Sequence, residues 1–198
     1  MKLSQAKRDY YRKKAKKEGY RSRAAFKLSE LVNKYQLIQE GDYVVDFGCA
    51  PGGWLQVTSK LVGAEGRVFG FDLKKVDINL SNVYTYVLDV TSPDALNFVK
   101  KSVVYEVDLI LSDLAPNIVG VWELDHARQI DLTLRVIDMV PHLLRPGGNC
   151  VFKIFQGRYL ELVRDRLKEM FEKVFVTKPS ASRKESSEVY VVCLSFLG

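Results

Sequence analysis

The chain has 198 residues, of which 47% are hydrophobic and 27% are charged. This length and composition can bury one substantial core, so we expect a single domain over residues 1–198. The longest apolar stretches, at residues 43–47 and 189–197, are well short of the roughly 20 residues that a membrane-spanning helix needs. The basic N-terminus has no apolar segment with a cleavage site, which predicts a cytoplasmic protein; we also expect a monomer.

The cysteine and histidine content argues against a metal site. Cys49, Cys150 and Cys193 are widely spaced among apolar residues, which indicates buried free thiols rather than a disulfide framework or a metal-ligand pair. Only His126 and His142 could add imidazole ligands. We therefore expect no structural metal.

The net charge of +6 comes from the N-terminal region. Residues 1–35 hold 12 Lys and Arg against 3 acidic residues, whereas residues 36–198 hold 18 against 21. Tyr10, Tyr11 and Tyr20 are interleaved with basic residues that can contact phosphates, namely Lys7, Arg8, Arg12, Lys13, Lys14, Lys16 and Lys17. Nucleic acid is the expected partner, although the run taken alone could equally be a solvated tail.

From residue 43 onward, short β-branched runs alternate with longer amphipathic stretches, which is typical of a doubly wound α/β fold. We expect strands at residues 43–47, 67–71, 83–88, 107–112, 149–155, 173–177 and 188–196. Helices are expected at residues 22–35, 53–61, 95–101, 121–144 and 158–170. The segment 178–187 is too short for a crossover helix, so the last two strands should form an antiparallel hairpin. Such a mostly parallel seven-stranded sheet is similar to the Rossmann-like methyltransferase fold.

The first strand leads directly into a glycine-rich turn. Gly48, Gly52 and Gly53 can let the backbone approach a ligand closely at the carboxyl end of the sheet. The spacing is neither that of a dinucleotide site nor that of a phosphate loop, which disfavours nucleotide diphosphates. Asp46 could accept a hydrogen bond from the ammonium group of a methionine moiety, or it could equally be a capping carboxylate.

Two more carboxylates follow the next two strands. Asp72 stands where a ribose diol would lie, and Asp89 could accept from an adenine amine, although a helix cap after Thr91 is the more common role for Asp89 alone. Together with Asp46 and the glycine turn, they describe a pocket for an adenosine with a cationic amino-acid tail. The expected cofactor is therefore S-adenosylmethionine.

Two further residues point to catalysis. Asp113 follows the fourth strand and should lie over the same edge of the sheet. Lys153 is inside an otherwise apolar strand, where a lysine is costly unless it is paired or neutral; a lysine that snorkels to the strand end is an equal alternative.

Five segments of the chain form a recognisable set: RSRAAFKL at residues 21–28, VVDFGCAPGGW at 44–54, SDLAPN at 112–117, FKIFQG at 152–157 and SRKESSEVY at 182–190. They closely resemble the FtsJ-like family of RNA ribose 2'-O-methyltransferases. The resemblance covers residues 20–198 and is specific, because all five motifs occur in the family order with compatible spacing. Cys49 replaces an alanine familiar from bacterial members, and the N-terminal arm differs from theirs.

The resemblance implies methyl transfer from S-adenosylmethionine to a ribose 2'-hydroxyl, expected to be a uridine's, in large-subunit ribosomal RNA or the large ribosomal subunit. It places the family's catalytic tetrad on Lys27, Asp113, Lys153 and Glu188. It places the binding of the methyl donor on Gly52, Trp54, Asp72, Asp89 and Asp113. Lys153 would be the general base, Asp113 would orient Lys153 and the methyl donor, and Lys27 and Glu188 would position the ribose and the neighbouring lysine.

Other functions fit the sequence less well. Family members also modify transfer RNA anticodon loops and messenger RNA caps, but the short chain favours the compact ribosomal type. A non-catalytic RNA-binding assembly factor would not need the intact tetrad, and a small-molecule methyltransferase would not explain the basic N-terminus. Arg183 and Lys184 could extend an RNA-binding surface or form a solvated turn.

Overall fold

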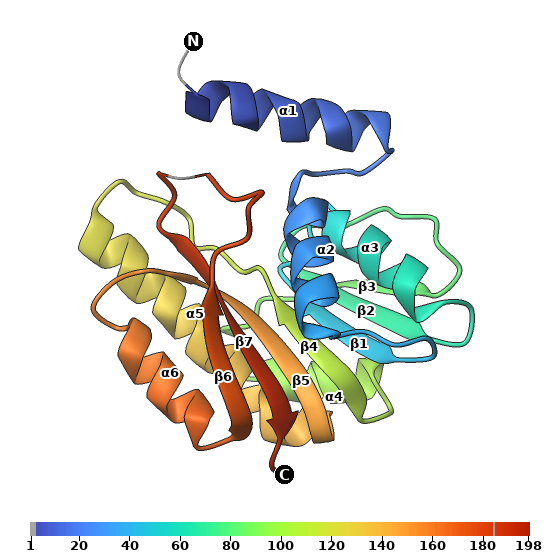
Figure 1. Cartoon of the computed structure of the whole chain (residues 1–198). Coiled ribbons are helices and arrows are strands. Elements are labelled where there is room, and N and C mark those ends of the chain that lie inside the picture. Colours follow the sequence, from blue (N-terminus) through green and yellow to red (C-terminus); the bar gives the residue numbers. More distant parts are fainter. Residues whose placement is uncertain (1–2, 184) are drawn as a thin grey trace.

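The computed structural model describes residues 3–183 and 185–198, with side chains from Tyr10 onward. One seven-stranded sheet is covered by helices on both faces (Figure 1). The strands are β1 (Tyr43–Phe47), β2 (Arg67–Asp72), β3 (Val83–Val87), β4 (Val107–Ser112), β5 (Leu144–Phe155), β6 (Phe171–Thr177) and β7 (Glu188–Phe196). The helices are α1 (Leu3–Lys17), α2 (Ala24–Tyr35), α3 (Gly53–Val62), α4 (Ala95–Ser102), α5 (Trp122–Leu143) and α6 (Leu160–Lys168). Among the described helices, none is long and apolar enough to cross a bilayer.

The strand order is β3-β2-β1-β4-β5-β7-β6, and β7 runs antiparallel to both of its neighbours. The predicted α/β fold and the C-terminal antiparallel hairpin are therefore confirmed. The sequence did not indicate that β7 would enter between β5 and β6. This insertion pairs Glu188 with Phe155 and Tyr190 with Lys153, so the beginning of β7 lies beside the end of β5.

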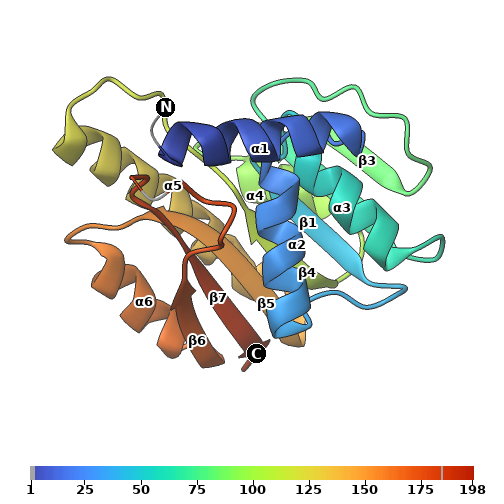
Figure 2. The same cartoon turned by 45° about the horizontal axis from the view of Figure 1, so that its top comes forward.

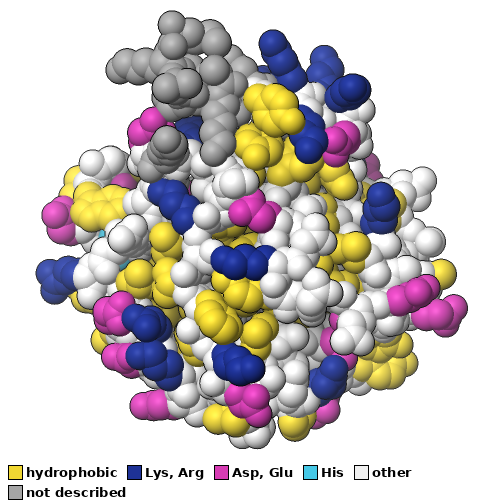
Figure 3. Space-filling view, in the orientation of Figure 1, with side chains coloured by type: hydrophobic (Ala, Val, Ile, Leu, Met, Phe, Trp, Pro, Cys, Tyr) yellow, Lys and Arg dark blue, Asp and Glu magenta, His cyan; other side chains and the backbone are white. Residues whose placement is uncertain are grey.

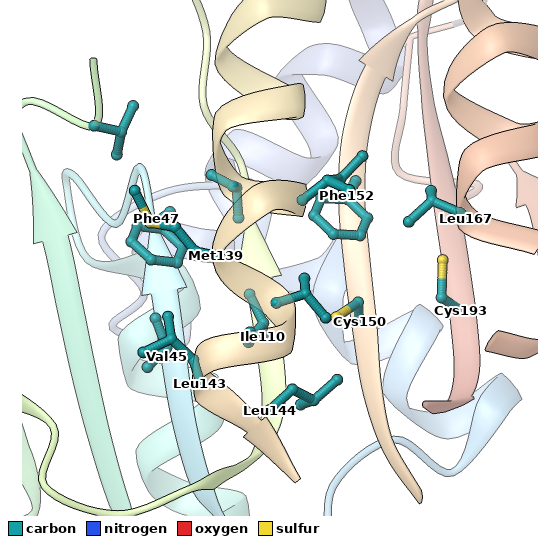
Figure 4. Close-up of a cluster of buried hydrophobic side chains, with 14 of the residues drawn as sticks. Val45, Phe47, Ile110, Met139, Leu143, Leu144, Cys150, Phe152, Leu167 and Cys193 are labelled. Atoms are coloured by element: carbon teal, nitrogen blue, oxygen red, sulfur yellow. The ribbon is translucent and has the colours of Figure 1, made fainter. Parts of the chain in front are cut away.

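Alternating side chains divide the core into two layers. Val44, Leu109 and Leu111 pack under α2 and α3, whereas Val45 and Ile110 face α4, α5 and α6. Figure 4 shows part of the second layer, where Val45, Phe47 and Ile110 lie beside Met139 and Leu143. All three cysteines are free and buried, as the sequence predicts. The fully buried strands explain the near-continuous apolar runs of the central sheet.

Element boundaries differ most at β5 and α6. β5 begins at Leu144, five residues before the expected start, because Val107 pairs with Leu144 before the register shifts and Leu109 pairs with Asn149. The segment between the two pairs contains Pro146, Gly147 and Gly148, which indicate a turn in the sequence. α6 is shorter than expected at both ends, the usual uncertainty of helix termini.

The basic N-terminal segment, expected only to be an arm, forms the helix α1. Figures 1 and 2 show α1 lying across the end of the sheet where β7 begins, which is the carboxyl end of the parallel strands. Phe26 of α2 receives the rings of Tyr11 and Tyr20, each with its centroid 5.6 Å away, and Lys14 lies over the same ring. The side chains of Lys7 and Arg8, and residue Lys184, lie outside the described part.

Candidate active site

The glycine turn after β1 brings two distant segments together. Gly48 has a φ of +78°, and a Cβ atom there would lie 2.8 Å from the backbone nitrogen of Leu114. The backbone N–H of Asp113 donates to the carbonyl of Phe47 at 2.9 Å. Gly52 follows with a φ of +105° and precedes the first residue of α3. The turn is therefore packed directly against the loop that follows β4.

A pocket of about 320 Å³ opens between this turn and the ends of β2, β3 and β4. This volume lies at the lower end of the range for small-molecule sites. Three of the predicted carboxylates, Asp72, Asp89 and Asp113, line the pocket together with Gly48. Its apolar walls, which the sequence did not indicate, include Leu73, Leu88, Val90, Leu114, Pro116 and Leu132. The pocket thus combines apolar walls for a flat ring with acceptors for hydroxyl and amine groups.

Asp72 both builds the pocket and remains able to bind a ligand. Its two carboxylate oxygens accept hydrogen bonds from the backbone N–H groups of Ala50, at 2.9 Å, and Lys74, at 2.8 Å. Each oxygen of a carboxylate has a further lone pair, so acceptor capacity is left for a ribose diol. The arrangement fits the predicted role in holding a ribose.

Asp89 does not cap the helix that follows it, so that alternative is wrong. α4 begins at Ala95, and Asp94 takes the cap position. One oxygen of Asp89 instead accepts from the hydroxyl and the backbone N–H of Thr91, and these hydrogen bonds lower the pKa of Asp89. The exposed carboxylate is therefore ionised at the rim of the pocket, where it can accept a hydrogen bond.

Asp46 is fully buried near the end of β1, and neither carboxylate oxygen has a hydrogen-bond partner among the described residues. The capping alternative is therefore wrong as well. Burial raises the pKa of Asp46 well above its usual value, and the negative charges of Asp113 and Asp72 raise it further. A buried acid without a partner is a candidate for binding a cation, although Asp46 is not among the lining residues of the pocket.

Asp46→Asn is expected to stabilise the cofactor-free protein at pH 7 more than at pH 4. The unfolded carboxyl group loses its proton near pH 3.8, whereas the folded group resists ionisation, so wild-type stability falls as the pH rises above that value. The asparagine side chain does not ionise, so the stability of the variant does not fall with pH for this reason. Urea unfolding at both pH values measures the two free-energy differences, and equal differences would contradict the buried, unpartnered state of Asp46.

Trp54 is placed differently from a ligand-binding side chain. Its indole is buried, packs on Tyr190 and donates from Nε1 to the carbonyl of Ala24 at 2.9 Å. The side chain therefore joins α3 to α2. Only the backbone of Trp54 is available to a cofactor, in the first turn of α3, where helix N–H groups lack intrahelical partners.

Lys27 and Glu188, from opposite ends of the sequence, form an ion pair in which Lys27 is buried and the side chain of Glu188 is 26% exposed. Lys27, which is 5% exposed, donates from Nζ to Oε2 of Glu188 at 2.8 Å and to the hydroxyl of Tyr190 at 3.2 Å. Burial raises the pKa of Glu188, but the charge and hydrogen bond of Lys27, together with Lys153 and Ser186, outweigh burial and lower this pKa. Glu188 is consequently a carboxylate at neutral pH.

Lys153 and Asp113 complete the group. Lys153 is 5% exposed, and its Nζ lies 2.8 Å from the backbone oxygen of Asp113 and 3.1 Å from Oδ1 of the same residue. A snorkelling lysine is therefore excluded. The hydroxyl of Tyr190 lies 3.5 Å from Asp113 Oδ1 and so links this pair to Lys27. The structure thus brings all four predicted tetrad residues together through Tyr190, whose connecting role the sequence did not indicate.

Gln129 supports the strand segment that contains Lys153. β4 ends at Ser112, opposite Phe152, so in the described part of the chain the next residues of β5 have no partner strand on that side. The fully buried amide of Gln129 forms hydrogen bonds with their backbone instead. Its Nε2 donates to the carbonyl of Lys153 at 2.7 Å, and its Oε1 accepts from the N–H of Phe155 at 3.3 Å. A side-chain amide from α5 therefore continues the hydrogen-bonding ladder of the sheet.

Gln129→Leu is expected to lower the free energy of unfolding by about 1–3 kcal/mol, because it leaves two buried backbone groups without partners. Methyl transfer should fall about 10-fold or more, since a small displacement of Lys153 misaligns the reacting groups. Thr133→Val is the matched control, because Thr133 accepts from Gln129 but does not bond to β5. Urea unfolding and a methyl-transfer assay would contradict this role if both variants lost stability but retained the wild-type rate.

A basic groove of about 860 Å³ lies between α1 and the segment leading into α2. Its lining residues are Arg12, Lys13, Ala15, Lys16, Tyr20, Arg21, Ser22, Arg23 and Arg183. Figure 3 shows dark blue Lys and Arg side chains gathered at the upper right, where α1 lies in Figure 1. Arg21 is anchored to the carbonyl groups of Pro51 and Asp77, which fixes the groove next to the glycine turn. The groove ends one helical turn before Lys27.

A doubly wound sheet with a carboxylate-rimmed pocket at the carboxyl ends of β1 to β4, and with β7 inserted antiparallel, defines a Rossmann-like methyltransferase that uses S-adenosylmethionine. The motif residues that build this edge are those of one group within that class. The chain belongs to the FtsJ-like methyltransferase family, which it matches over residues 20–196.

Relatives cover the chain almost completely. The sequence is 46% identical over 197 residues to a ribosomal RNA large subunit methyltransferase E of Methanococcus aeolicus, covering 99% of this chain and 73% of the relative. It is 43% identical to the protein of the same name from Nitrosopumilus maritimus, with full coverage of both chains.

Solved structures agree with this assignment. One described as a candidate ribosomal RNA methyltransferase of Plasmodium falciparum matches with a TM-score of 0.80 and 33% identity, covering 90% of this chain and 100% of that chain. Fibrillarin of Aeropyrum pernix, solved with natively bound S-adenosyl-L-methionine, shares the fold with a TM-score of 0.61 at 16% identity, over 88% of this chain and 75% of that one.

Proposed function

We propose that this chain transfers a methyl group from S-adenosylmethionine to a ribose 2'-hydroxyl of large-subunit ribosomal RNA. One observation carries the chemistry: four residues from α2, the loop after β4, β5 and β7 meet in a connected network beside the carboxylate-rimmed pocket. The RNA class rests on the names of the full-length relatives.

The residues at the pocket suit the methyl donor. Asp72 would hold the ribose hydroxyls, Asp89 would accept from the adenine amine, and Gly48 and Gly52 would allow close backbone approach. The free N–H groups at the start of α3, including that of Trp54, would bind the carboxylate of the methionine tail. When bound, the donor supplies an electrophilic sulfonium methyl group.

Lys153 is the proposed general base. A neutral lysine amine has two N–H donors and one lone pair. The backbone oxygen and Oδ1 of Asp113 occupy the two donors. The lone pair is then left for the proton of the ribose hydroxyl as the oxygen attacks the methyl group and the sulfur leaves as a neutral thioether. Asp113 thereby orients the base, and alignment of the three reacting atoms supplies much of the acceleration.

Lys27 and Glu188 are proposed to position the ribose. Their ion pair is fixed by Tyr190, and burial together with the carboxylates of Asp113 and Glu188 raises the pKa of this phenol, so it stays neutral. The basic groove beside them would hold the RNA backbone through phosphate contacts. We also propose that the enzyme works as a monomer in the cytoplasm.

The test is transfer of radiolabelled methyl from S-adenosylmethionine to large ribosomal subunits and to transfer RNA from a strain lacking this protein, followed by nucleoside mapping. We expect a 2'-O-methylated nucleotide, a uridine by resemblance, in large-subunit RNA. Label in transfer RNA alone would assign the other substrate class. Cofactor binding without label in either RNA would indicate a non-catalytic assembly factor.

A further inference from the structure

An exposed apolar cluster at the start of α5 has no role in the site described above. Trp122 is 44% exposed, and Ile118, Val119, Val121 and Leu124 beside it are also exposed. The segment continues directly from Ala115, Pro116 and Asn117, which line the cofactor pocket. Exposed apolar side chains gathered next to a polar active site indicate a surface that becomes covered by a ligand or partner.

The cluster is held in place by buried neighbours. The ring of Trp122 lies nearly parallel to that of His126, with centroids 5.6 Å apart, and to that of Phe155, with centroids 6.0 Å apart. His126 itself is buried and packs closely on Gly157. A Cβ atom added at Gly157 would lie 2.4 Å from the imidazole ring of His126.

Asp125 fixes the preceding loop by accepting hydrogen bonds from the N–H groups of Val119 and Gly120, at 2.9 and 3.0 Å. The indole of Trp122 is thus supported from the helix, the loop and β5. A ring fixed in this way can bind a planar group at a low cost in conformational entropy.

The same contacts place the cluster close to the catalytic lysine. Phe155, which touches Trp122, is two residues beyond Lys153 on β5, and strand geometry separates such positions by about 7 Å. Phe155 is also paired with Glu188. The exposed indole is therefore close to the place of the reacting ribose. A base that neighbours the methylated nucleotide in the RNA strand could reach this indole.

We propose that Trp122 is a stacking platform for a nucleobase of the RNA, next to the nucleotide whose ribose is methylated. The proposal rests on the function proposed above. A ribose can reach Lys153 only if its nucleotide is splayed from its neighbours, which leaves a neighbouring base without its stacking partner. Aromatic side chains bind such bases without regard to sequence.

The first turn of α5 itself holds the acidic Glu123 and the buried Asp125, so the positive charge that favours RNA comes from neighbouring segments. The guanidinium of Arg158 lies 4.6 Å from the ring of Tyr159, which in turn packs on His126. The groove of α1 adds the positive charge of Arg12, Lys13 and Lys16 at the same edge of the sheet. Phosphate contacts in the groove and base stacking on Trp122 would together hold an extended strand across Lys153.

The test compares Trp122→Ala, Trp122→Phe and the control Leu162→Ala, which removes an exposed apolar side chain from α6. We expect Trp122→Ala to raise the KM for large-subunit RNA and the Kd for a single-stranded oligouridine about 10-fold. Trp122→Phe should restore most of the affinity. Leu162→Ala should behave as wild type, and the affinity for S-adenosylmethionine should be the same in all three.

Tryptophan fluorescence gives a second readout, because Trp54 is buried and Trp122 is exposed. Oligouridine should quench the wild-type emission but not that of Trp122→Phe. The platform would be overturned if Trp122→Ala kept the RNA affinity of the wild type, or if oligouridine quenched Trp122→Phe as much as the wild type. Sedimentation that then differed between Trp122→Ala and the wild type would assign the patch to a protein contact. If the wild type bound oligouridine and was quenched but methylated no RNA, the proposed function would fail; Trp122 would then stack a base, but not one next to a methylated nucleotide.

Discussion

Lys153→Ala is expected to lower the rate of methyl transfer by about 1000-fold or more while leaving the affinity for S-adenosylmethionine nearly unchanged. The rate falls because the ribose hydroxyl loses its proton acceptor, a contribution of about 100-fold to 10,000-fold in enzymes, and because the amine no longer aligns the oxygen. The affinity persists because the pocket is lined by Asp72, Asp89 and Asp113, and not by Lys153. Single-turnover transfer and calorimetric titration with the cofactor measure the two effects.

Lys153→Arg separates a base from a fixed positive charge. A guanidinium keeps the charge beside Asp113 but cannot lose a proton in the accessible pH range, so this variant should also be inactive. Thermal unfolding checks that both variants fold. Transfer by Lys153→Arg near the wild-type rate, or a large loss of cofactor affinity in Lys153→Ala, would rule out the role of Lys153 as the base.

The sequence predicts much of the site because its residues occupy special positions in a regular pattern. Asp72 ends β2, and Asp89 and Asp113 follow β3 and β4. Because the carboxyl ends of parallel strands meet at one edge, their convergence follows from the α/β pattern. Lys153 stands out because a lysine inside an apolar strand needs a partner. Lys27 and Glu188 carry no such signal, and only the resemblance to the family identifies them.

Other features depend on tertiary contacts that have no local signal. In the sequence, Gln129 is an ordinary polar residue on a helix. Its role depends on the pairing of β4 with β5, which ends at Phe152 and so leaves the carbonyl of Lys153 to Gln129. The indole of Trp54 joins α3 to α2, a contact that the resemblance, which places Trp54 among the donor-binding positions, did not indicate. α1 has no apolar stripe, so its helical form could not be predicted from periodicity.

Gly48→Ala is expected to weaken the binding of S-adenosylmethionine at least 10-fold and to lower the kcat/KM about 100-fold. The new Cβ would lie 2.8 Å from the nitrogen of Leu114 and 3.0 Å from the carbonyl carbon of Asp113, both in the backbone. The loop after β4 must therefore move. That movement shifts one wall of the pocket. It also shifts Asp113, whose backbone oxygen and Oδ1 hold Lys153. A displacement of about 1 Å is enough for such a loss of rate.

Gly41→Ala is the matched control, because Gly41 also has a positive φ, of +90°, but has open space around its Cβ position. Both variants carry the backbone cost of an alanine in the left-handed region, about 1 kcal/mol. Only Gly48→Ala also carries the contact with the loop. Calorimetry should therefore show wild-type cofactor affinity for Gly41→Ala. If the two variants lost affinity equally, backbone strain alone would account for the loss. The alignment of the pocket with the catalytic lysine would then not depend on the close packing of the glycine turn against Asp113 and Leu114.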